Sequence, residues 1–246
     1  MTSFSAFLLN LESRDVLTDR ERDIAQSLCE DGHVMDAGTD IVREGDAPSY
    51  SCLLLSGFAA RYNVLVDGRR QITAVHVAGD FIDLHSLLLT RMDHSVLALD
   101  ECRVAFVPHD LLRDLTAREP HFTRLLWLLT VIDAAAYRQW LVAAGRLSSA
   151  GQIAHFMCEM YERLRIVDLV DGLSLRLPMN QVDLSDAMGL SVVHVNRTLQ
   201  LLRESGPVAA IGLAFAVQQL PAIPAEPFDQ PLDLIVTDRG CVVPCR

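Results

Sequence analysis

The spacing of apolar residues between positions 180 and 206 predicts two short helices joined by a tight turn. Asn180 can cap the first helix, with Asp183 at the third helical position as an acidic variant of the capping box. Gly189 supplies the turn, and Ser191 caps the second helix. Along the second helix a buried stripe recurs at i, i+4 and i+7, formed by Val195, Leu199 and Leu202. This pattern is typical of a helix-turn-helix.

The sides of the two helices that this stripe leaves open carry the residues that a DNA-reading motif would use. The candidate contacts to bases and phosphates are Gln181, Ser191, Val193, His194, Asn196, Arg197 and Gln200. Two amphipathic helices separated by a glycine also occur in helical domains that never bind nucleic acid. The periodicity by itself leaves both interpretations open.

The first hundred residues show a different period. Short β-rich or alternating runs are separated by glycine and aspartate turn signals, and they cover residues 33–37, 39–43, 50–56, 59–66 and 71–77. Strands at this spacing predict an antiparallel barrel or jelly roll.

After Pro108 the period changes to about 3.6, and Pro120 opens a long apolar helix that reaches about Ala144. A 4-3-4-3-4 spacing predicts a coiled-coil seam for a dimer, formed by Leu125, Leu129, Ile132, Ala136, Gln139 and Ala143. A helix buried within one domain would also give this run, because the segment is apolar nearly all round. A further helix is expected over 149–165, followed by a short strand at 173–177.

Residues 190–206 carry a more specific signal than their periodicity. They follow the pattern L-S-x-x-x-V-N-R-T-L-x-x-L-R-x-x-G, which is similar to the DNA-binding motif of the Crp/Fnr superfamily of bacterial transcription regulators. Four upstream phrases resemble the cyclic-nucleotide-binding effector domain of that family, in the family's order: REGD at 43–46, LLLSG at 53–57, DGRRQI at 67–72 and GDF at 79–81.

The resemblance implies an α+β protein in three parts. An antiparallel β jelly-roll sensor is expected over 1–119, a dimerisation helix over 120–145, and a winged-helix-like helix-turn-helix domain with an atypical tail over 146–246. A two-fold dimer would place paired reading helices one DNA turn apart. The expected partners are double-stranded DNA, a second copy of the chain and an unidentified small-molecule effector, and the resemblance admits RNA polymerase as a further partner.

The sequence departs from the best-known family members where they read bases. Those members carry Arg-Glu after the capping serine, whereas this chain has Val192 and Val193. Val193 could pack on a thymine methyl group and favour a T·A pair, and Arg197 keeps the family position for a bidentate contact with guanine. His194 could donate a hydrogen bond to phosphate. The alternatives are that the valines only pack the turn and that His194 is a solvated helix residue.

The candidate effector pocket departs further from the family. Cyclic-nucleotide binders carry Gly-Glu and then Arg-Ser or Arg-Thr, which hold the cyclic phosphate. Here Ile82 and Asp83 replace the first pair, and Asp93 or His94 stands at the arginine position. A negative Asp93 would repel the phosphate, so a response to cyclic AMP is not expected. The candidate pocket residues are Phe81, Asp83, Leu84, His85, His94 and Ser95.

The charge balance is unfavourable for DNA binding. The formal net charge is −11, and the three arginines between 176 and 206 are cancelled by Asp183, Asp186 and Glu204. Since non-specific affinity comes from neutralising phosphates, only the placement of Arg197 and of the helix N-termini can favour binding. Binding is expected to be weak and salt-sensitive unless the DNA site is specific.

Other classes of function have weaker support. Catalytic residues, cofactors and metal are all expected to be absent, because no nucleophile triad, phosphate loop or zinc-spaced cysteine set occurs. The six cysteines are scattered, with only Cys29 ahead of the barrel, which argues against an iron-sulfur cluster. Two alternatives stay open: a degenerate sensor dimer that acts through protein partners without binding DNA and, far behind, a cupin-like metal enzyme using barrel histidines.

The last forty residues are the least family-like part. Residues 208–217 could form a first hairpin, and 232–237 with 241–243 a second, around Asp238-Arg239-Gly240. The four prolines between them, at 221, 224, 227 and 231, favour an extended segment. An altered terminus that impairs DNA binding is a further hypothesis. No signal peptide or membrane span is expected, which predicts a cytoplasmic protein.

Overall fold

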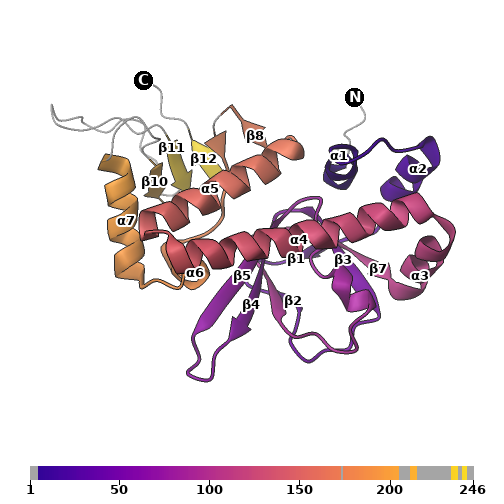
Figure 1. Ribbon diagram of the computed structural model, residues 1–246, viewed down its shortest axis with the longest axis horizontal. Helices are drawn as coiled ribbons and strands as arrows, with labels where there is room; N and C mark the ends of the chain where they lie inside the picture. The colour runs from indigo at the N-terminus through magenta and orange to yellow at the C-terminus, as the bar shows by residue number, and fades with distance from the viewer. Residues whose placement is uncertain (1–4, 173, 205–210, 215–233, 238–239, 243–246) are drawn as a thin grey trace.

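The computed structural model describes residues 5–172, 174–204, 211–214, 234–237 and 240–242. A β-barrel lies on one side of a long central helix, α4, and the helix-turn-helix lies near one end of that helix (Figure 1). The predicted fold class, with an antiparallel barrel, a long helix and a helix-turn-helix domain, is confirmed.

Two antiparallel sheets form the barrel. One has the order β1-β7-β3 and the other the order β2-β6-β4-β5. The strands are β1 (Gly32–Met35), β2 (Asp40–Val42), β3 (Tyr50–Ser56), β4 (Phe58–Val64), β5 (Arg70–Val77), β6 (Ser95–Ala98) and β7 (Cys102–Pro108). A short 3-10 helix, η1 (Leu84–Leu87), lies between β5 and β6. Every strand expected from the alternating pattern is present, and β6 and β7 complete the sheets.

Gly57 turns the chain from β3 into β4. Its φ of 85° lies in the left-handed region, and a Cβ there would be 2.7 Å from the carbonyl oxygen of Glu101. Only glycine fits both conditions without strain. The turn directs β4 into the second sheet, where its first residue, Phe58, pairs with Val77 of β5.

Helices cover the barrel and lead away from it. They are α1 (Ala6–Glu12), α2 (Asp19–Ser27), α3 (His109–Arg118) and α4 (Pro120–Arg146). Pro120 begins α4 as the sequence predicts, since a missing N–H costs nothing in the first turn. The first turns of α4 are held in a core that joins Phe122, Leu125 and Leu126 to Phe7 and Leu11 of α1.

The helix-turn-helix follows α5 (Ser149–Ile166) and the short pair β8 (Val170–Asp171) and β9 (Ser174–Leu175). Its helices are α6 (Gln181–Met188) and α7 (Val192–Glu204). The capping box of Asn180 and Asp183 forms, and Gly189 is left-handed with a φ of 65°. Both local predictions are confirmed.

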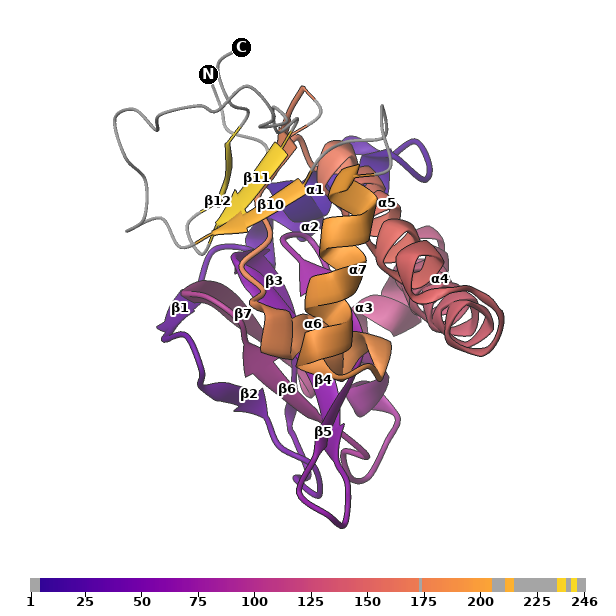
Figure 2. The ribbon, with the colours of Figure 1, turned by 90° about the vertical axis from the view of Figure 1, so that its left-hand side faces the viewer.

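The helix-turn-helix is joined to the barrel by a shared hydrophobic core. Ile72 and Val75 of β5 lie in one cluster with Phe156 of α5, Leu184 of α6 and Val195 of α7. Viewed from that end of the molecule, α6 and α7 lie directly above β4 and β5 (Figure 2). The two parts therefore pack as one body in this conformation.

Three C-terminal strands form a small sheet beside the helix-turn-helix domain: β10 (Ile211–Ala214), β11 (Leu234–Thr237) and β12 (Gly240–Val242). β11 and β12 are antiparallel, in agreement with the predicted second hairpin. β10 pairs in parallel with β11, which differs from the predicted first hairpin, because β10 finds its partner across a long connection and not across a tight turn. The proline-rich segment lies outside the described residues, so the structure does not test its predicted extended form or the hypothesis of an altered terminus.

Candidate DNA-reading surface and sensor pocket

Helix α7 presents a continuous exposed side. Val195 is fully buried and Leu199 is nearly so, as the predicted stripe requires. Ser191 caps the helix by accepting a hydrogen bond from the backbone N–H of His194 at 3.2 Å. The remaining predicted contact residues on this helix are exposed: Val193, His194, Asn196, Arg197 and Gln200.

Two polar contacts fix the orientation of this side. His194 Nε2 lies 3.1 Å from the hydroxyl of Ser149 on α5, and Asn196 donates to the side-chain oxygen of the half-buried Gln181 at 3.2 Å. Arg197 has no hydrogen-bond or ion-pair partner among the residues that the structure describes. Its guanidinium can therefore contact a ligand without first breaking a contact to the described part of the chain.

The acidic residues of α6 are neutralised from the barrel. Arg70 of β5 donates to Asp183 at 2.6 Å and to Asp186 at 2.8 Å. The sequence count treats both aspartates as charges that oppose DNA binding, but each is paired with a cation from 113 or 116 residues away. Arg70 therefore lowers the negative charge that the helix-turn-helix presents to a phosphate backbone.

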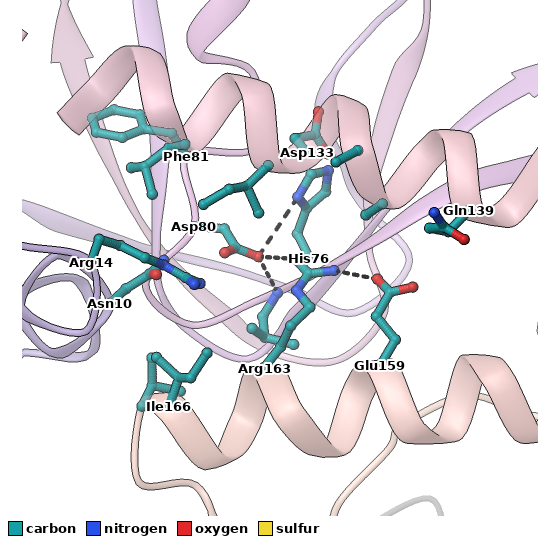
Figure 3. Close-up of a pocket in the computed structure, with 16 residues that line it drawn as sticks. Asn10, Arg14, His76, Asp80, Phe81, Asp133, Gln139, Glu159, Arg163 and Ile166 are labelled. Carbon is teal, nitrogen blue, oxygen red and sulfur yellow. Dashed lines mark hydrogen bonds and ion pairs between the residues drawn. The ribbon is translucent and has the colours of Figure 1, made fainter. Parts of the chain in front are cut away.

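The predicted dimer seam on α4 faces the inside of the molecule. Leu125 and Ala143 are buried in the chain's own core, so neither side chain is exposed on the surface of this protomer. Leu129, Ile132, Ala136 and Gln139 line a cavity of about 280 Å³ between the barrel, α4 and α5 (Figure 3). The seam residues therefore pack against or face the same protomer.

A second stripe with the same 4-3-4-3-4 spacing lies two residues further along α4, about 200° round the helix. All six of its residues are exposed: Trp127, Val131, Ala134, Arg138, Leu141 and Gly145. We call these residues the outer stripe. Trp127 is 68% exposed and Leu141 is 66% exposed. Large apolar side chains in a contiguous exposed row are typical of an interaction surface.

By length and composition alone, α4 could also cross a membrane. Its most apolar 18-residue window has a mean hydropathy of 1.2 and is 11% buried, so the expectation that no segment could span a membrane is not met by this helix. The evidence is weak, because Asp133 in the middle of α4 is paired with Arg61 at 2.9 Å. A helix that packs on a barrel through an ion pair has the contacts of a globular protein.

The predicted effector residues divide into two groups. Phe81 and Leu84 are buried in the hydrophobic core, and the carboxylate of Asp83 accepts a hydrogen bond from the backbone N–H of Cys52. Ser95 accepts from the backbone N–H of Glu44. Asp83, Leu84 and Ser95 support the barrel wall, whereas Phe81 also lines the cavity beside α4 (Figure 3). His85 and His94 are brought together, with ring centroids 5.0 Å apart.

Burial sets the protonation of this region. It raises the pKa of Asp83 to about 7, although the hydrogen bond from Cys52 opposes the shift. Burial and the positive charge of Arg61 together lower the pKa of His85 to about 4. The pKa of His94 falls for the same two reasons. Both imidazoles are therefore neutral at pH 7.

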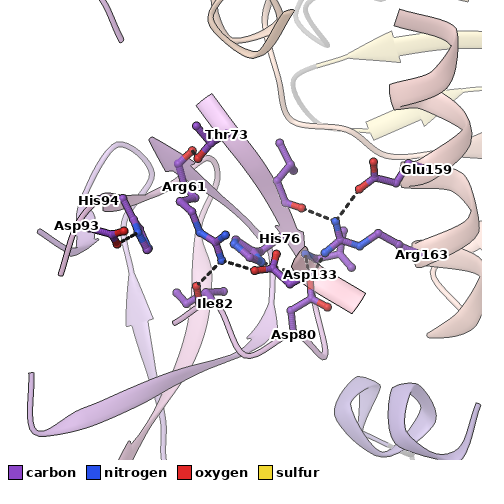
Figure 4. Close-up of polar contacts among 12 residues, drawn as sticks. Arg61, Thr73, His76, Asp80, Ile82, Asp93, His94, Asp133, Glu159 and Arg163 are labelled. Carbon is purple, nitrogen blue, oxygen red and sulfur yellow. Dashed lines mark hydrogen bonds and ion pairs between the residues drawn. The ribbon is translucent and has the colours of Figure 1, made fainter. Parts of the chain in front are cut away.

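A row of polar side chains leads from this region to α5 (Figure 4). Arg61 of β4 pairs with Asp133 of α4, and Arg163 of α5 pairs with Asp80, next to His76. Burial alone would raise the pKa of Asp80, but Arg163 and His76 outweigh it and lower the pKa to about 2. The row connects the barrel, the central helix and the first helix of the DNA-reading part.

Comparison with known proteins agrees with this geometry. Residues 33–119 match the profile of the cyclic nucleotide-binding domain, and residues 151–222 match that of the Crp-like helix-turn-helix domain. The chain belongs to the Crp/Fnr family of transcription regulators. The prediction from the motif at 190–206 is confirmed.

Individual relatives place the chain among regulators. It is 28% identical over 178 residues to the nitrogen fixation regulation protein FixK of Bradyrhizobium diazoefficiens, covering 71% of this chain and 73% of that one. It is 26% identical over 157 residues to the protein of the same name from Azorhizobium caulinodans, covering 64% of this chain and 62% of that one. The chain is thus a sequence-specific DNA-binding regulator by family.

Solved structures share the architecture. The structure of FixK2 from Bradyrhizobium japonicum has a TM-score of 0.64 at 25% identity and covers 72% of this chain and 85% of that chain. The c-di-GMP responsive global regulator CLP of Xanthomonas campestris has a TM-score of 0.60 at 16% identity, covering 74% and 91%. The second likeness shows the fold alone.

Within this Crp/Fnr protein, the sequence analysis above does not identify two features of the structure. The pairing of Arg70 with α6 joins residues more than 100 positions apart, and no local pattern signals it. The outer stripe was open to prediction, because its spacing is as regular as that of the seam chosen from the sequence. Both features lie outside the exposed side of α7. The residues of that side were predicted from the local pattern of helix α7.

Proposed function

We propose that this Crp/Fnr protein binds duplex DNA as a homodimer, with α7 of each protomer in a major groove and Arg197 contacting a guanine. The observation that carries the proposal is the exposed side of α7, on which Arg197 has no partner among the described residues. A bidentate arginine-guanine contact contributes about 1 to 3 kcal/mol of discrimination between bases. The further proposed phosphate or base contacts are Ser191 at the start of α7, Gln181 on α6, and Asn196 and Gln200 on the exposed side of α7.

Val193 gives the proposed site its preference for a particular base pair. It is 63% exposed near the start of α7, so it can reach a base edge. A valine cannot hydrogen-bond a base, but it can pack on the methyl group of thymine. We expect a T·A pair at the position where relatives with glutamate read cytosine. His194, held by Ser149, is close enough to the helix start to donate to a phosphate.

The outer stripe of α4 is the proposed dimer interface. Two such helices packed about a two-fold axis would cover Trp127, Val131 and Leu141, which the isolated chain leaves exposed. Arg138 lies in the same stripe, and Asp133 is engaged with Arg61 on the inner side. A dimer also gives the reading helices the paired spacing that a two-part DNA site needs.

Cyclic AMP is not the proposed effector. The position that holds the cyclic phosphate in relatives carries Asp93 and His94, and the exposed carboxylate of Asp93 would repel a phosphate. Asp83, at the place of the family's glutamate, is turned into the barrel wall. As a regulator that reads chromosomal DNA, the protein is proposed to act in the bacterial cytoplasm, where RNA polymerase would be a further partner.

A selection from random duplexes tests the proposal. Full-length protein should enrich a two-fold symmetric site with a guanine in each half, and fluorescence anisotropy then measures the affinity. Arg197→Ala should weaken binding to the enriched site about 5- to 150-fold and relax the preference for guanine. Arg113→Ala is the matched control, because Arg113 is exposed on α3, away from the reading helix (Figure 1).

Two results would contradict the proposal. Failure to enrich any sequence at low salt would favour a dimer that acts through protein partners. Equal loss of affinity in Arg197→Ala and Arg113→Ala would mean that binding depends on overall charge, without a specific contribution from α7.

A further inference from the structure

Two histidines and an aspartate meet on the barrel at a place where the family pattern is lost. His85 lies in η1, and Asp93 and His94 lie just before β6. Each of the three side chains offers one ligand atom, and these atoms all lie within 4.8 Å of one another. The two rings are 5.0 Å apart with an angle of 49° between their planes. We call these residues the His-His-Asp cluster.

The nitrogens of this cluster lack the partners that buried polar atoms normally have. His94 is 6% exposed, and its Nδ1 lies 2.7 Å from a carboxylate oxygen of Asp93. With Nδ1–H donating to that oxygen, Nε2 keeps its lone pair. Nε2 of His94 and Nε2 of His85 are both buried without a hydrogen-bond partner among the described residues. Each such atom calls for an explanation, and a role as a metal ligand is one.

We propose that the His-His-Asp cluster binds a first-row divalent transition ion of the zinc type. Neutral imidazole is a preferred ligand for these ions, whereas magnesium and calcium prefer oxygen ligands. Asp93 orients His94 in the way that a carboxylate orients a metal-binding histidine. This contact fixes the tautomer and makes Nε2 a more basic ligand for the metal. Water would complete the coordination, because the side chain of Asp93 is 78% exposed and leaves the site open to solvent.

The surrounding charges permit a cation here. Arg61 is the positive group whose charge acts on both imidazoles, and it is paired with Asp133 at 2.9 Å. Asp93 adds a negative charge at the cluster itself. Counting Arg61, Asp133 and Asp93, the region carries a net charge of about −1 with neutral histidines. A bound cation would therefore neutralise this surface.

The ion pair of Arg61 and Asp133 can couple binding of the ion to the position of α4. A divalent ion beside the histidines would repel Arg61, and Arg61 holds α4 through Asp133. Binding would alter the contact between the barrel and the helix that carries the outer stripe. In this respect the inference deepens the proposed function and rests on it, since it names the chemical class of the effector.

Titration of the untagged full-length protein tests the site without DNA. Co²⁺ binding is followed by visible absorption and Zn²⁺ binding by calorimetry. We expect one ion per chain, with the protein-bound Co²⁺ bands lost in His85→Gln and in His94→Gln. Asp93→Asn should weaken binding about 10- to 100-fold. His33→Gln, which removes an exposed imidazole on β1, should bind as the wild type does.

Folding of each variant is checked by thermal unfolding. His85 is only half-buried and Asp93 is exposed, so His85→Gln and Asp93→Asn keep the test valid even where His94→Gln fails to fold. Absence of a bound ion in the wild type would overturn the proposal, and so would binding that persists in His85→Gln. An ion bound by a protein that fails to bind DNA would contradict the proposed function alone. DNA binding without metal uptake would contradict this inference alone.

Discussion

The two faces of α4 carry stripes of the same spacing in opposite surroundings. The inner face holds Leu125 and Ala143 in the core of the protomer and pairs Asp133 with Arg61 of the barrel. The outer stripe, two residues further on, leaves Trp127 and Leu141 about two-thirds exposed. The difference teaches that a heptad pattern identifies a helix with two apolar sides, and that only the packing of neighbouring elements decides which side is free for a partner.

Leu141→Glu is the strongest test of the outer face. The side chain is exposed in the protomer, so the substitution should leave the monomer folded, but in a dimer two carboxylates would meet near the two-fold axis. We expect a monomer in sedimentation velocity. DNA affinity should fall about 100-fold or more, because two linked reading helices bind much more tightly than one.

Gln139→Glu is the matched control for this change. It introduces the same charge two residues away, at an exposed position of the seam predicted from the sequence that lines the internal cavity. The dimer should survive. A dimer that persists in Leu141→Glu and dissociates in Gln139→Glu would show that the sequence prediction had the correct face.

Leu125→Ala tests the inner face. Leu125 is 3% exposed and packs with Phe122 and the first helix of the chain. Removing a fully buried leucine side chain should lower the free energy of unfolding by about 2 to 5 kcal/mol. Urea unfolding measures the change. Leu88→Ala, at a position 86% exposed, should stay within about 0.5 kcal/mol of the wild type. Equal effects of the two substitutions would mean that the inner face is not a core.

The sequence could predict the DNA-reading part because its signals are local. The Asn180 cap, the left-handed Gly189 and the i, i+4 stripe of α7 each depend on a few neighbouring residues, and all three are present. The same holds for the barrel strands, which alternate between turn residues. Motif resemblance then supplied the function, since two amphipathic helices alone do not specify DNA binding.

The remaining features depend on contacts between distant segments. His85 and His94 were both among the predicted pocket residues, but their approach requires the fold of η1 against β6. The burial of Asp83 and Phe81 in the barrel wall likewise follows from tertiary packing and not from spacing. The spacing of α4 does not show which of its two stripes is exposed, because the inner face is covered by α1, the barrel and α5.

Acid unfolding tests the ion pair between Asp80 and Arg163, which lies on the inner side of α4. The folded pKa of Asp80 is about 2, below its ordinary value of 3.8. The stabilisation is complete above about pH 4 and is lost as the pH falls towards 2, since the unfolded state then takes up the proton first. The loss amounts to about 2 kcal/mol.

Urea unfolding of the wild type and Asp80→Asn at pH 4.5 and 2.5 measures this contribution. The difference in unfolding free energy between the two proteins should shrink by about 1.5 kcal/mol at the lower pH, which is most of the full loss. Arg163→Gln should reduce the pH dependence in the same way, because Arg163 supplies the positive charge that lowers the pKa of Asp80. A difference that stays constant across this range would exclude the ion pair as its source.

Asp133→Asn should give the smallest of these effects. The asparagine keeps an oxygen for Arg61 but loses the negative charge, and the side chain of Asp133 is 33% exposed, so water screens the pair in part. We expect a loss of about 1 kcal/mol in unfolding free energy, with the dimer intact. Arg138→Gln, in the outer stripe, should change the stability of the protomer by less than about 0.5 kcal/mol. Asp133 and Arg138 lie five positions apart on α4. A general loss of helix stability would therefore lower the unfolding free energy of both variants and could not give a loss in one and none in the other. A dissociated dimer in Asp133→Asn, together with an unchanged unfolding free energy, would reverse the assignment of the two faces.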